Sequence, residues 1–306
     1  MSTTIATIQL FEKLIKYGTS NDRLVGSWAM ENDGTQKLLE LHNYTMMVTD
    51  PNQCILPNYG KGHIGIITEF FDIILGLNPG FVHYEWPFYA DWIEEDGKYP
   101  YSYGELIKSQ WKITKAKLVE SEGNTRHASM FCWDRDCHYR DFVPCTHMFH
   151  FQQIDGKLCL TVTMRSQDAV KGWYLDSFLY SHLACIMAKQ VGLPVGLYTV
   201  FQHNVHVYPR DQDKLVDRLD YLKNNSSYLS NGEIPTPSDE DYGPLYDALK
   251  YVYEEKGIYS SAPLDKIDSD YYRSLMALIY AKQYPEEDLS EYMHTPAHER
   301  WYKKLR

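Results

Sequence analysis

One stretch of the 306-residue chain gathers three kinds of chemically useful side chain. Cys145 comes first, after a proline, and an Arg-Ser-x-Asp cluster follows from Arg165 to Asp168. Asp176 lies shortly beyond that cluster. A thiol becomes a nucleophile when nearby cations lower its pKa, and arginine pairs with phosphate in a charge-assisted, often bidentate geometry. These residue types in this order predict a thiol-dependent transferase that binds a phosphorylated substrate.

Each candidate also has an ordinary structural interpretation. A cysteine after proline is most often an inert core thiol, and Asp176 is a suitable N-cap for a helix. Arg23 lies in a polar segment, Thr19–Arg23, where a solvated loop arginine is the simpler interpretation. Glu69 interrupts a strongly apolar helical pattern, and a buried carboxylate is costly unless it is paired or used. The sequence leaves function and a structural ion pair open for Glu69.

Composition limits the class of protein. Hydrophobic residues make up 44% and charged residues 23% of the chain, as in ordinary globular proteins. The net charge of −11 argues against an extended nucleic-acid or anionic-membrane surface, although a local arginine pocket can still bind a small anion. No apolar run approaches the roughly 18 residues of a membrane span, and the N-terminus lacks a signal-peptide pattern. We therefore expect a cytoplasmic protein that binds neither membrane nor nucleic acid.

The six cysteines suggest neither a disulfide framework nor a metal site. Reduced thiols are expected in a long chain without an export signal. Cys132, Cys137, Cys145 and His147 lack the C-x2-C spacing of a zinc site. We expect no metal.

Hydrophobic periodicity predicts the elements that must position these residues. Helices are expected over Thr4–Tyr17, His63–Leu77 and Asp176–Gln190, the last with Asp176 as its N-cap. Strands are expected at the end of Asn124–Trp133, in a hairpin over His147–Gln152 and Leu158–Arg165 with Asp155-Gly156 as its turn, and over Leu197–Tyr208. Cys145 would then precede a strand, while His206 and Tyr208 would share one strand face.

The chain changes character after Arg210. Residues 224–244 are rich in Asn, Ser, Pro, Asp and Glu, which predicts a loop. Three tyrosine-rich segments beyond it are predicted to be helical: Tyr246–Glu255, Lys266–Lys282 and Glu287–Leu305. We therefore divide the chain into a catalytic domain, residues 1–212, and a helical C-terminal extension, residues 213–306, packed on the same domain.

Several motifs together resemble those of the thymidylate synthase superfamily over roughly residues 10–210. They are Pro144-Cys145, the M-R-S-Q-D of Met164–Asp168, Gly172, the H-V-Y of His206–Tyr208, the N-D-R ending at Arg23, Glu69–Gly76 (E-F-F-D-I-I-L-G against the family's E-L-L-W-F-L-x-G), Tyr103-Gly104, and the T-R-H of Thr125–His127 in place of S-R-R. The resemblance implies an α+β fold with a large mixed β-sheet packed with helices, and a homodimer formed through that sheet. The family's C-terminal flap is not recognisable.

The resemblance also implies roles for individual residues. Cys145 would attack C6 of a pyrimidine nucleotide, and Glu69 would order water and relay protons. Asp168, Trp86 and Glu69 would contact the co-substrate, 5,10-methylenetetrahydrofolate. The remaining roles are in substrate binding: Arg23, Arg165 and Ser166 at the phosphate, Arg126 from the partner subunit, and His206 and Tyr208 at the sugar hydroxyl. His127 and His150 replace an arginine and a glutamine of the family, so those two contacts are not carried over.

Two departures from the family pattern point to cytosine as the base. Thr146 follows the cysteine, where thymidylate synthases have histidine, and Asp176 stands where uracil-using members have asparagine. The 4-amino group of cytosine is a donor and suits a carboxylate, whereas O4 of uracil is an acceptor and suits a carboxamide. The resemblance therefore implies a deoxycytidylate (dCMP) 5-hydroxymethylase. Water, in place of hydride, would add to the exocyclic methylene at C5, giving 5-hydroxymethyl-dCMP and tetrahydrofolate.

Three alternatives remain open. A ribonucleotide (CMP) 5-hydroxymethylase differs by one sugar hydroxyl, which no motif distinguishes. A thymidylate synthase or dUMP hydroxymethylase is opposed by Asp176. A non-catalytic homologue that binds nucleotide, or a partner through its helical tail, is opposed by the joint presence of Cys145, Glu69, Arg165 and Asp168. Because dCMP hydroxymethylases are typical of phages that modify their DNA, we expect a viral source and a host cytoplasm.

Overall fold

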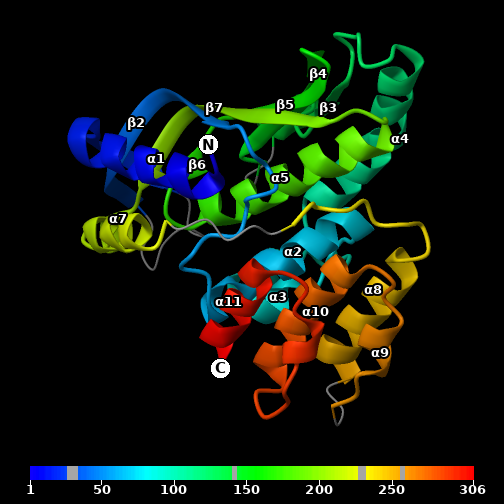
Figure 1. Cartoon of the computed structure of the whole chain (residues 1–306). Coiled ribbons are helices and arrows are strands. Elements are labelled where there is room, and N and C mark those ends of the chain that lie inside the picture. The colour runs from blue at the N-terminus through cyan, green and yellow to red at the C-terminus, as the bar shows by residue number, and fades with distance from the viewer. Residues whose placement is uncertain (26–33, 140–142, 227–231, 256–258) are drawn as a thin grey trace.

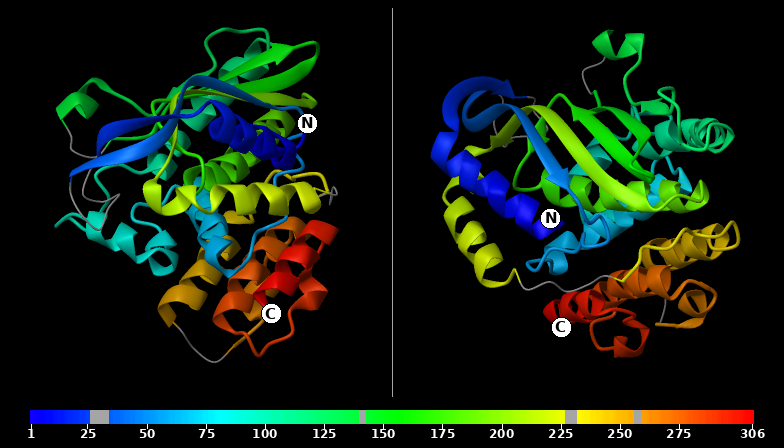
Figure 2. Two further views of the ribbon diagram at one scale, coloured as in Figure 1. Left: turned by 90° about the vertical axis from the view of Figure 1, so that its left-hand side faces the viewer. Right: turned by 45° about the horizontal axis from the view of Figure 1, so that its top comes forward.

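A computed structural model describes residues 1–25, 34–139, 143–226, 232–255 and 259–306. In this part of the chain a mixed β-sheet lies on a layer of helices (Figure 1). Helices from the C-terminal end form a further layer on the side away from the sheet, as the turned views in Figure 2 also show. The predicted α+β architecture, a large mixed sheet packed with helices, is confirmed.

The sheet has the strand order β1-β2-β7-β5-β4-β3, with β6 also paired to β7. β7 runs parallel to β5 and β6, and the remaining pairs are antiparallel. The strands are β1 Thr19–Val25, β2 Gly34–Val48, β3 Ser129–Phe131, β4 Thr146–Ile154, β5 Lys157–Met164, β6 Gln167–Asp168 and β7 Val195–Val207. The predicted hairpin and the strand that carries His206 are therefore both present.

The helices of the first two thirds of the chain lie mainly against one face of the sheet. They are α1 Thr3–Tyr17, α2 Ile64–Leu75, α3 Val82–Glu85, α4 Tyr103–Glu120, α5 Gly172–Gln190, α6 Pro209–Gln212 and α7 Leu215–Asn224, with 3₁₀ turns η2 Lys61–His63, η3 Pro87–Trp92 and η4 Arg135–Tyr139. α2 is buried at every position except Ile74, because it lies between the sheet-side helix α5 and the C-terminal layer. This burial puts the Glu69 carboxyl inside the protein.

The C-terminal layer contains α8 Tyr242–Lys250, the π-helical turn η5 Tyr251–Glu255, α9 Ala262–Asp265, α10 Asp270–Gln283, the 3₁₀ turn η6 Ser290–Tyr292 and α11 Pro296–Leu305. The last predicted helix is interrupted, because Thr295 caps a new one: its side chain accepts a hydrogen bond from the backbone N–H of His298, and Pro296 occupies the first helical position. No helix in the described ranges is both long and apolar enough to cross a membrane.

Two local predictions are wrong. Thr19–Arg23 is not a loop but the start of β1, paired in register with β2, because an edge strand tolerates polar side chains. Asp176 is not an N-cap, since α5 already begins at Gly172. The chain turns into α5 where the Asp168 carboxylate accepts hydrogen bonds from the backbone N–H groups of Val170 and Lys171, at 2.8 and 3.1 Å.

The division at residue 212 stays a prediction. α7, which lies beyond that boundary, packs on α1 and joins it through the Lys223–Glu12 ion pair at 2.8 Å. The buried hydrophobic side chains of both parts form one continuous cluster. The extension is thus seated on the rest of the protein through a shared core.

Candidate active site

Cys145 lies immediately before β4, and hydrogen bonds hold its backbone on both sides. Its N–H and that of Thr146 donate to the Tyr103 hydroxyl, at 2.9 and 3.2 Å. Its carbonyl accepts from the Arg165 N–H at 2.9 Å. No disulfide joins any of the six cysteines, and Cys145 alone among them is partly exposed. The backbone therefore presents one accessible thiol from a fixed position.

Arg165 spans the turn that leads to this cysteine. Its guanidinium donates to the carbonyls of Pro144 and Val143, both at 3.1 Å. Burial raises the pKa of the Cys145 thiol, and the positive charge of Arg165 acts in the opposite direction. Burial therefore favours the protonated thiol, and Arg165 is a cation that can stabilise its thiolate.

Asp176 lies on α5 with its carboxyl directed at Gln167. The Gln167 side-chain amide donates to Asp176 Oδ2 at 2.7 Å. Burial raises the pKa of Asp176 to about 7, against the effect of hydrogen bonds from Gln167 and Tyr180. Its charge in turn raises the pKa of Cys145, so the two groups act on each other. The carboxyl is thus poised to gain or lose a proton near neutral pH.

Gln167 is a site residue that the sequence analysis missed. It is 2% exposed, and its Oε1 has no hydrogen-bond partner among the described residues. Nε2 of the amide faces Asp176, which leaves Oε1 as an available acceptor. Only its place inside the M-R-S-Q-D motif could have drawn attention to it.

Glu69 faces a tyrosine and not a cation. The Tyr89 hydroxyl lies 3.2 and 3.3 Å from its two carboxylate oxygens. Burial raises the pKa of Glu69 to about 8, and the charge of Asp176 adds to this effect. No ion pair involves Glu69 in the described part of the chain. Glu69 is mostly protonated at neutral pH and can exchange protons near it.

A cavity of about 70 Å³ adjoins Glu69, between α2 and the segment that leads to α4. Tyr99, Tyr101 and Asp72 contribute to its wall. Asp72, which replaces the tryptophan of the family motif, accepts hydrogen bonds from the backbone N–H groups of Phe81 and Val82 at 2.9 and 2.8 Å. Asp72 therefore has a structural role at the start of α3.

Trp86 packs against Tyr89, which lines this cavity. Its indole lies where a Cβ on Gly65 of α2 would be, and it stacks with Tyr89 at a ring-centroid distance of 6.1 Å. Tyr89 is the hydrogen-bond partner of Glu69, so Trp86 packs against the residue that holds the Glu69 carboxyl. The half-buried Trp86 face still offers an aromatic surface beside Glu69.

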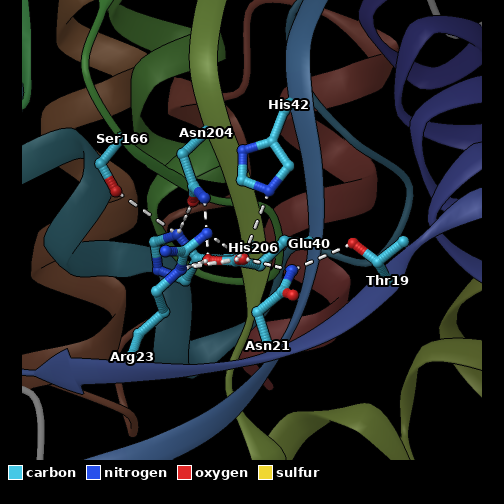
Figure 3. A network of polar contacts seen from close by, with 8 residues as sticks. All are labelled: Thr19, Asn21, Arg23, Glu40, His42, Ser166, Asn204 and His206. Atoms are coloured by element: carbon cyan, nitrogen blue, oxygen red, sulfur yellow. Dashed lines mark hydrogen bonds and ion pairs between the residues drawn. The ribbon is translucent and has the colours of Figure 1, made fainter.

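Three of the predicted phosphate and sugar residues, Arg23, Ser166 and His206, meet in one polar network (Figure 3). Ser166 Oγ lies 3.4 Å from His206 Nδ1, which lies 3.1 Å from Asn204 Oδ1. Asn204 donates to Glu40 at 2.8 Å, and Arg23 forms an ion pair with the same carboxylate at 3.0 Å. The sequence analysis missed Glu40 and Asn204, since only the pairing of β2 with β7 brings Glu40 opposite His206.

Tyr208 and Asp168 lie next to this network, whereas Arg126 does not. The Tyr208 ring is perpendicular to that of His206 at 4.9 Å, and the charge of Asp168 raises the pKa of Tyr208 beyond the effect of burial. Arg126 is exposed ahead of β3, and no hydrogen bond or ion pair links it to the site within the described ranges. Those ranges also contain no cluster of three or more potential metal ligands.

Comparison with known proteins identifies relatives of one kind. The thymidylate synthase family model matches residues 82–236, just over half of the chain. Thymidylate synthases of Fusobacterium nucleatum and Streptococcus suis are each 28% identical to it, over 43% of this chain and 50% of their own length. A Methanocaldococcus jannaschii protein named "Putative thymidylate synthase" is 25% identical over 70% of this chain and 89% of its own length. The chain spans about half the length of the first curated relatives it matches.

Proposed function

The chain belongs to the thymidylate synthase family, and we propose that it transfers a one-carbon unit to C5 of a pyrimidine nucleotide, as a dCMP 5-hydroxymethylase. The matched segment contains Cys145, Arg165, Asp168, Asp176 and His206, while Glu69 and Arg23 lie outside it. All of these except Arg23 are buried or half-buried in the structure. A chain of this family that retains a candidate nucleophile, acid and anion-binding residues supports a catalyst over a silent binding module.

The observation that carries the choice of cytosine is the Asp176–Gln167 pair. When Asp176 is ionised it accepts from the Gln167 amide, and both Asp176 and Gln167 Oε1, which has no partner among the described residues, can accept from the substrate. The 4-amino group of cytosine has two N–H donors and suits two acceptors, whereas O4 of uracil would face oxygen on both sides. A base with the wrong polar pairing leaves buried groups unsatisfied and is strongly rejected.

Different residues of the chain carry out different steps of the proposed reaction. The Cys145 thiolate forms a bond to C6 of the pyrimidine, which makes C5 nucleophilic, and Arg165 stabilises the thiolate before attack. Asp176, whose pKa is raised by burial to about 7, shares a proton with N3 and so favours addition at C6. Glu69 holds the water that adds to the exocyclic methylene at C5 and passes on the proton released from it. That methylene forms after C5 has bonded to the one-carbon unit, when the C5 proton and the folate amine leave. Addition of water to it moves an electron pair into the C5–C6 bond, which expels the Cys145 thiolate and restores the aromatic ring.

The co-substrate 5,10-methylenetetrahydrofolate supplies the one-carbon unit. The half-buried aromatic face of Trp86, beside Tyr89 and Glu69, suits a flat heterocycle such as a pterin. The Asp168 carboxylate, which is half-buried at the turn into α5, would hold that ring. Water next to Glu69, in place of hydride transfer from the folate, would give the hydroxymethyl product and tetrahydrofolate.

A homodimer through the sheet is part of the proposal. Helices cover one face of the sheet, and no helix of the described ranges covers the other face (Figures 1 and 2). One row of side chains crosses that uncovered face through neighbouring registers: Thr45, Phe201, Thr163, Met148 and Phe131. Phe131 is 53% and Met47 43% exposed, so an apolar surface is available for a second copy. Arg126 would enter the partner's site in this dimer.

Product identification tests the proposal. The protein is incubated with methylenetetrahydrofolate and, separately, dCMP, CMP or dUMP, and each nucleotide product is identified by mass. We expect a hydroxymethyl product from dCMP. Conversion of dUMP alone would favour the activity named for the curated relatives and overturn the choice of base, and no turnover of any nucleotide would leave a binding protein. Cys145→Ser is the matched control, which should bind nucleotide without turnover.

A further inference from the structure

Glu40 is a buried carboxylate that receives side chains from three strands. It lies on β2, is 1% exposed, and stands between β1 and β7 (Figure 3). Asn21 and Arg23 of β1 donate to it at 2.9 and 3.0 Å, and Asn204 of β7 donates at 2.8 Å. Burial alone would raise the pKa of Glu40, but these hydrogen bonds outweigh that effect and hold it below its ordinary value. Glu40 is therefore ionised and acts only as an acceptor.

This charge fixes the direction of the next two hydrogen bonds. Because Glu40 can only accept, Asn204 must present Nδ2 to it and turn Oδ1 toward His206 Nδ1, 3.1 Å away. An amide oxygen also only accepts, so the hydrogen of the neutral imidazole is on Nδ1. His206 Nε2 is then a lone-pair acceptor. It is buried without a partner among the described residues, so it is available to a ligand donor.

The same carboxylate orients Arg23. Both Nε and Nη2 of the guanidinium lie 3.0 Å from Glu40 oxygens, and the side chain is otherwise 47% exposed. Two of the five guanidinium N–H donors are therefore occupied, and the others remain for an anion. Ser166, whose Oγ lies 3.4 Å from His206 Nδ1, connects this end of the network to the Arg-Ser-x-Asp motif.

We propose that Glu40 is a positioning residue for the nucleotide: through Asn204 it keeps His206 Nε2 as the acceptor for a sugar hydroxyl, and through its ion pair it aims Arg23 at the phosphate. The inference rests on the proposed function only in requiring a pyrimidine nucleoside monophosphate as ligand. It does not depend on the base. A glutamine at this position could donate to Asn204 Oδ1, and the amide and imidazole would then lose their fixed orientations.

A purely structural Glu40 would behave differently. If it served only to join the three strands, its loss would lower stability and weaken every ligand by a similar factor. If Glu40 positions ligand-binding groups, the loss of affinity should depend on particular groups of the ligand, the 3′-hydroxyl and the phosphate. Ligands that lack one of these groups therefore separate the two interpretations.

The experiment measures equilibrium binding by calorimetry for dCMP, its 3′-deoxy analogue, deoxycytidine and dUMP. For Glu40→Gln we expect dCMP to weaken by about 10-fold or more, corresponding to one lost hydrogen bond to a charge-aligned group, and the 3′-deoxy analogue to weaken clearly less. Asn204→Ala should remove the 3′-hydroxyl advantage but keep the phosphate advantage of dCMP over deoxycytidine. His42→Gln, which removes only the longest contact to Glu40, at 3.4 Å, is the control and should leave all affinities unchanged.

Equal weakening of all ligands in Glu40→Gln, or no weakening, would overturn the proposal. Tighter binding of dUMP than dCMP by the wild-type protein would overturn the choice of base alone, and the 3′-hydroxyl test then proceeds with dUMP. ¹⁵N NMR of the His206 ring gives an independent measurement: we expect a protonated Nδ1 and an unprotonated Nε2 in the wild type, and a tautomer mixture in Glu40→Gln. The opposite wild-type tautomer would contradict the assignment.

Discussion

The surroundings of Cys145 and the C-terminal extension differ in whether their buried polar groups have hydrogen-bond partners. Near the thiol, Gln167 Oε1 and His206 Nε2 are buried without partners in the described structure, and burial raises the pKa of both Glu69 and Asp176. In the extension, the Tyr272 and Tyr280 hydroxyls donate to the carbonyls of Pro235 and Ala248, at 2.6 and 3.1 Å. The two unsatisfied acceptors lie where a ligand is expected, while Tyr272 and Tyr280 of the extension are satisfied by backbone carbonyls.

This difference in hydrogen bonding distinguishes positions that serve chemistry from positions that serve stability. A buried acceptor without a donor costs about 1–3 kcal/mol. Such a cost is tolerated at a site because the substrate removes it on binding. In the extension the same cost would only weaken the fold. His298, with both ring nitrogens, and the Tyr284 hydroxyl are exceptions there, since none of these atoms has a partner among the described residues.

The largest expected effect is on the choice of base. Asp176→Asn replaces an acceptor by an amide that can donate to O4 of uracil, so the ratio of kcat/KM for dCMP to that for dUMP should fall by about 10²-fold or more. Steady-state kinetics with both nucleotides measures it. Asp217→Asn, the same change at an exposed position on α7, should leave the ratio unchanged. An unaltered ratio in Asp176→Asn would remove Asp176 from base recognition.

The next prediction tests whether the buried Glu69 carboxyl lowers the stability of the fold while it contributes to activity. Glu69→Gln keeps the shape but cannot transfer a proton, so kcat should fall by about 10²–10⁴-fold. The folded-state pKa of Glu69, about 8, lies above its ordinary 4.5, so the wild type loses stability as pH rises from about 4.5 toward 8. Glutamine does not titrate. Thermal unfolding should therefore show Glu69→Gln more stable than the wild type at pH 8, on the order of 2 kcal/mol, with little difference at pH 4.

The opposite pH dependence is expected in the extension. Burial lowers the pKa of His298 to about 3, below its ordinary 6.5, so its contribution is fully favourable above pH 6.5 and is lost as pH falls toward 3. His298→Leu should gain about 2 kcal/mol of stability relative to the wild type at pH 5, and less at pH 7. Denaturant unfolding at the two pH values measures it. His127→Leu, at an exposed position, is the control; an equal gain there would show that burial is not the cause.

The two regions also differ in how far sequence could predict them. The positions of Cys145, Arg165 and His206 follow from motifs and strand periodicity, because local pattern places each at a strand end or on a strand face. Glu40 and Gln167 could not be found that way: Glu40 meets Arg23 and Asn204 only through strand pairing, and the Gln167–Asp176 bond requires the turn into α5.

Predictions in the extension were limited for a different reason. Its tyrosine-rich segments have helical patterns, so the helices were expected, but their contacts with α2 join residues far apart in sequence. The Tyr253 hydroxyl lies 2.7 Å from Thr68 Oγ1 and donates to Glu85 at 2.9 Å. Glu85 also pairs with Lys282 and accepts from Gln283 at 3.1 Å. Such contacts depend on tertiary docking, which no local pattern encodes.

The smallest predicted effect tests whether the docking of the extension on α2, the helix that carries Glu69, serves only stability. Tyr253→Phe removes both hydroxyl contacts but leaves Lys282 and Gln283 on Glu85, so stability should fall by about 1 kcal/mol while kcat at 25 °C stays unchanged. Tyr284→Phe is the matched control, since the Tyr284 hydroxyl has no partner in the described ranges and its removal should cost nothing. Thr68 is adjacent to Glu69 on α2. A fall in kcat well beyond the loss of folded protein would therefore mean that the extension also positions the acid, and the contrast between the two regions would no longer hold.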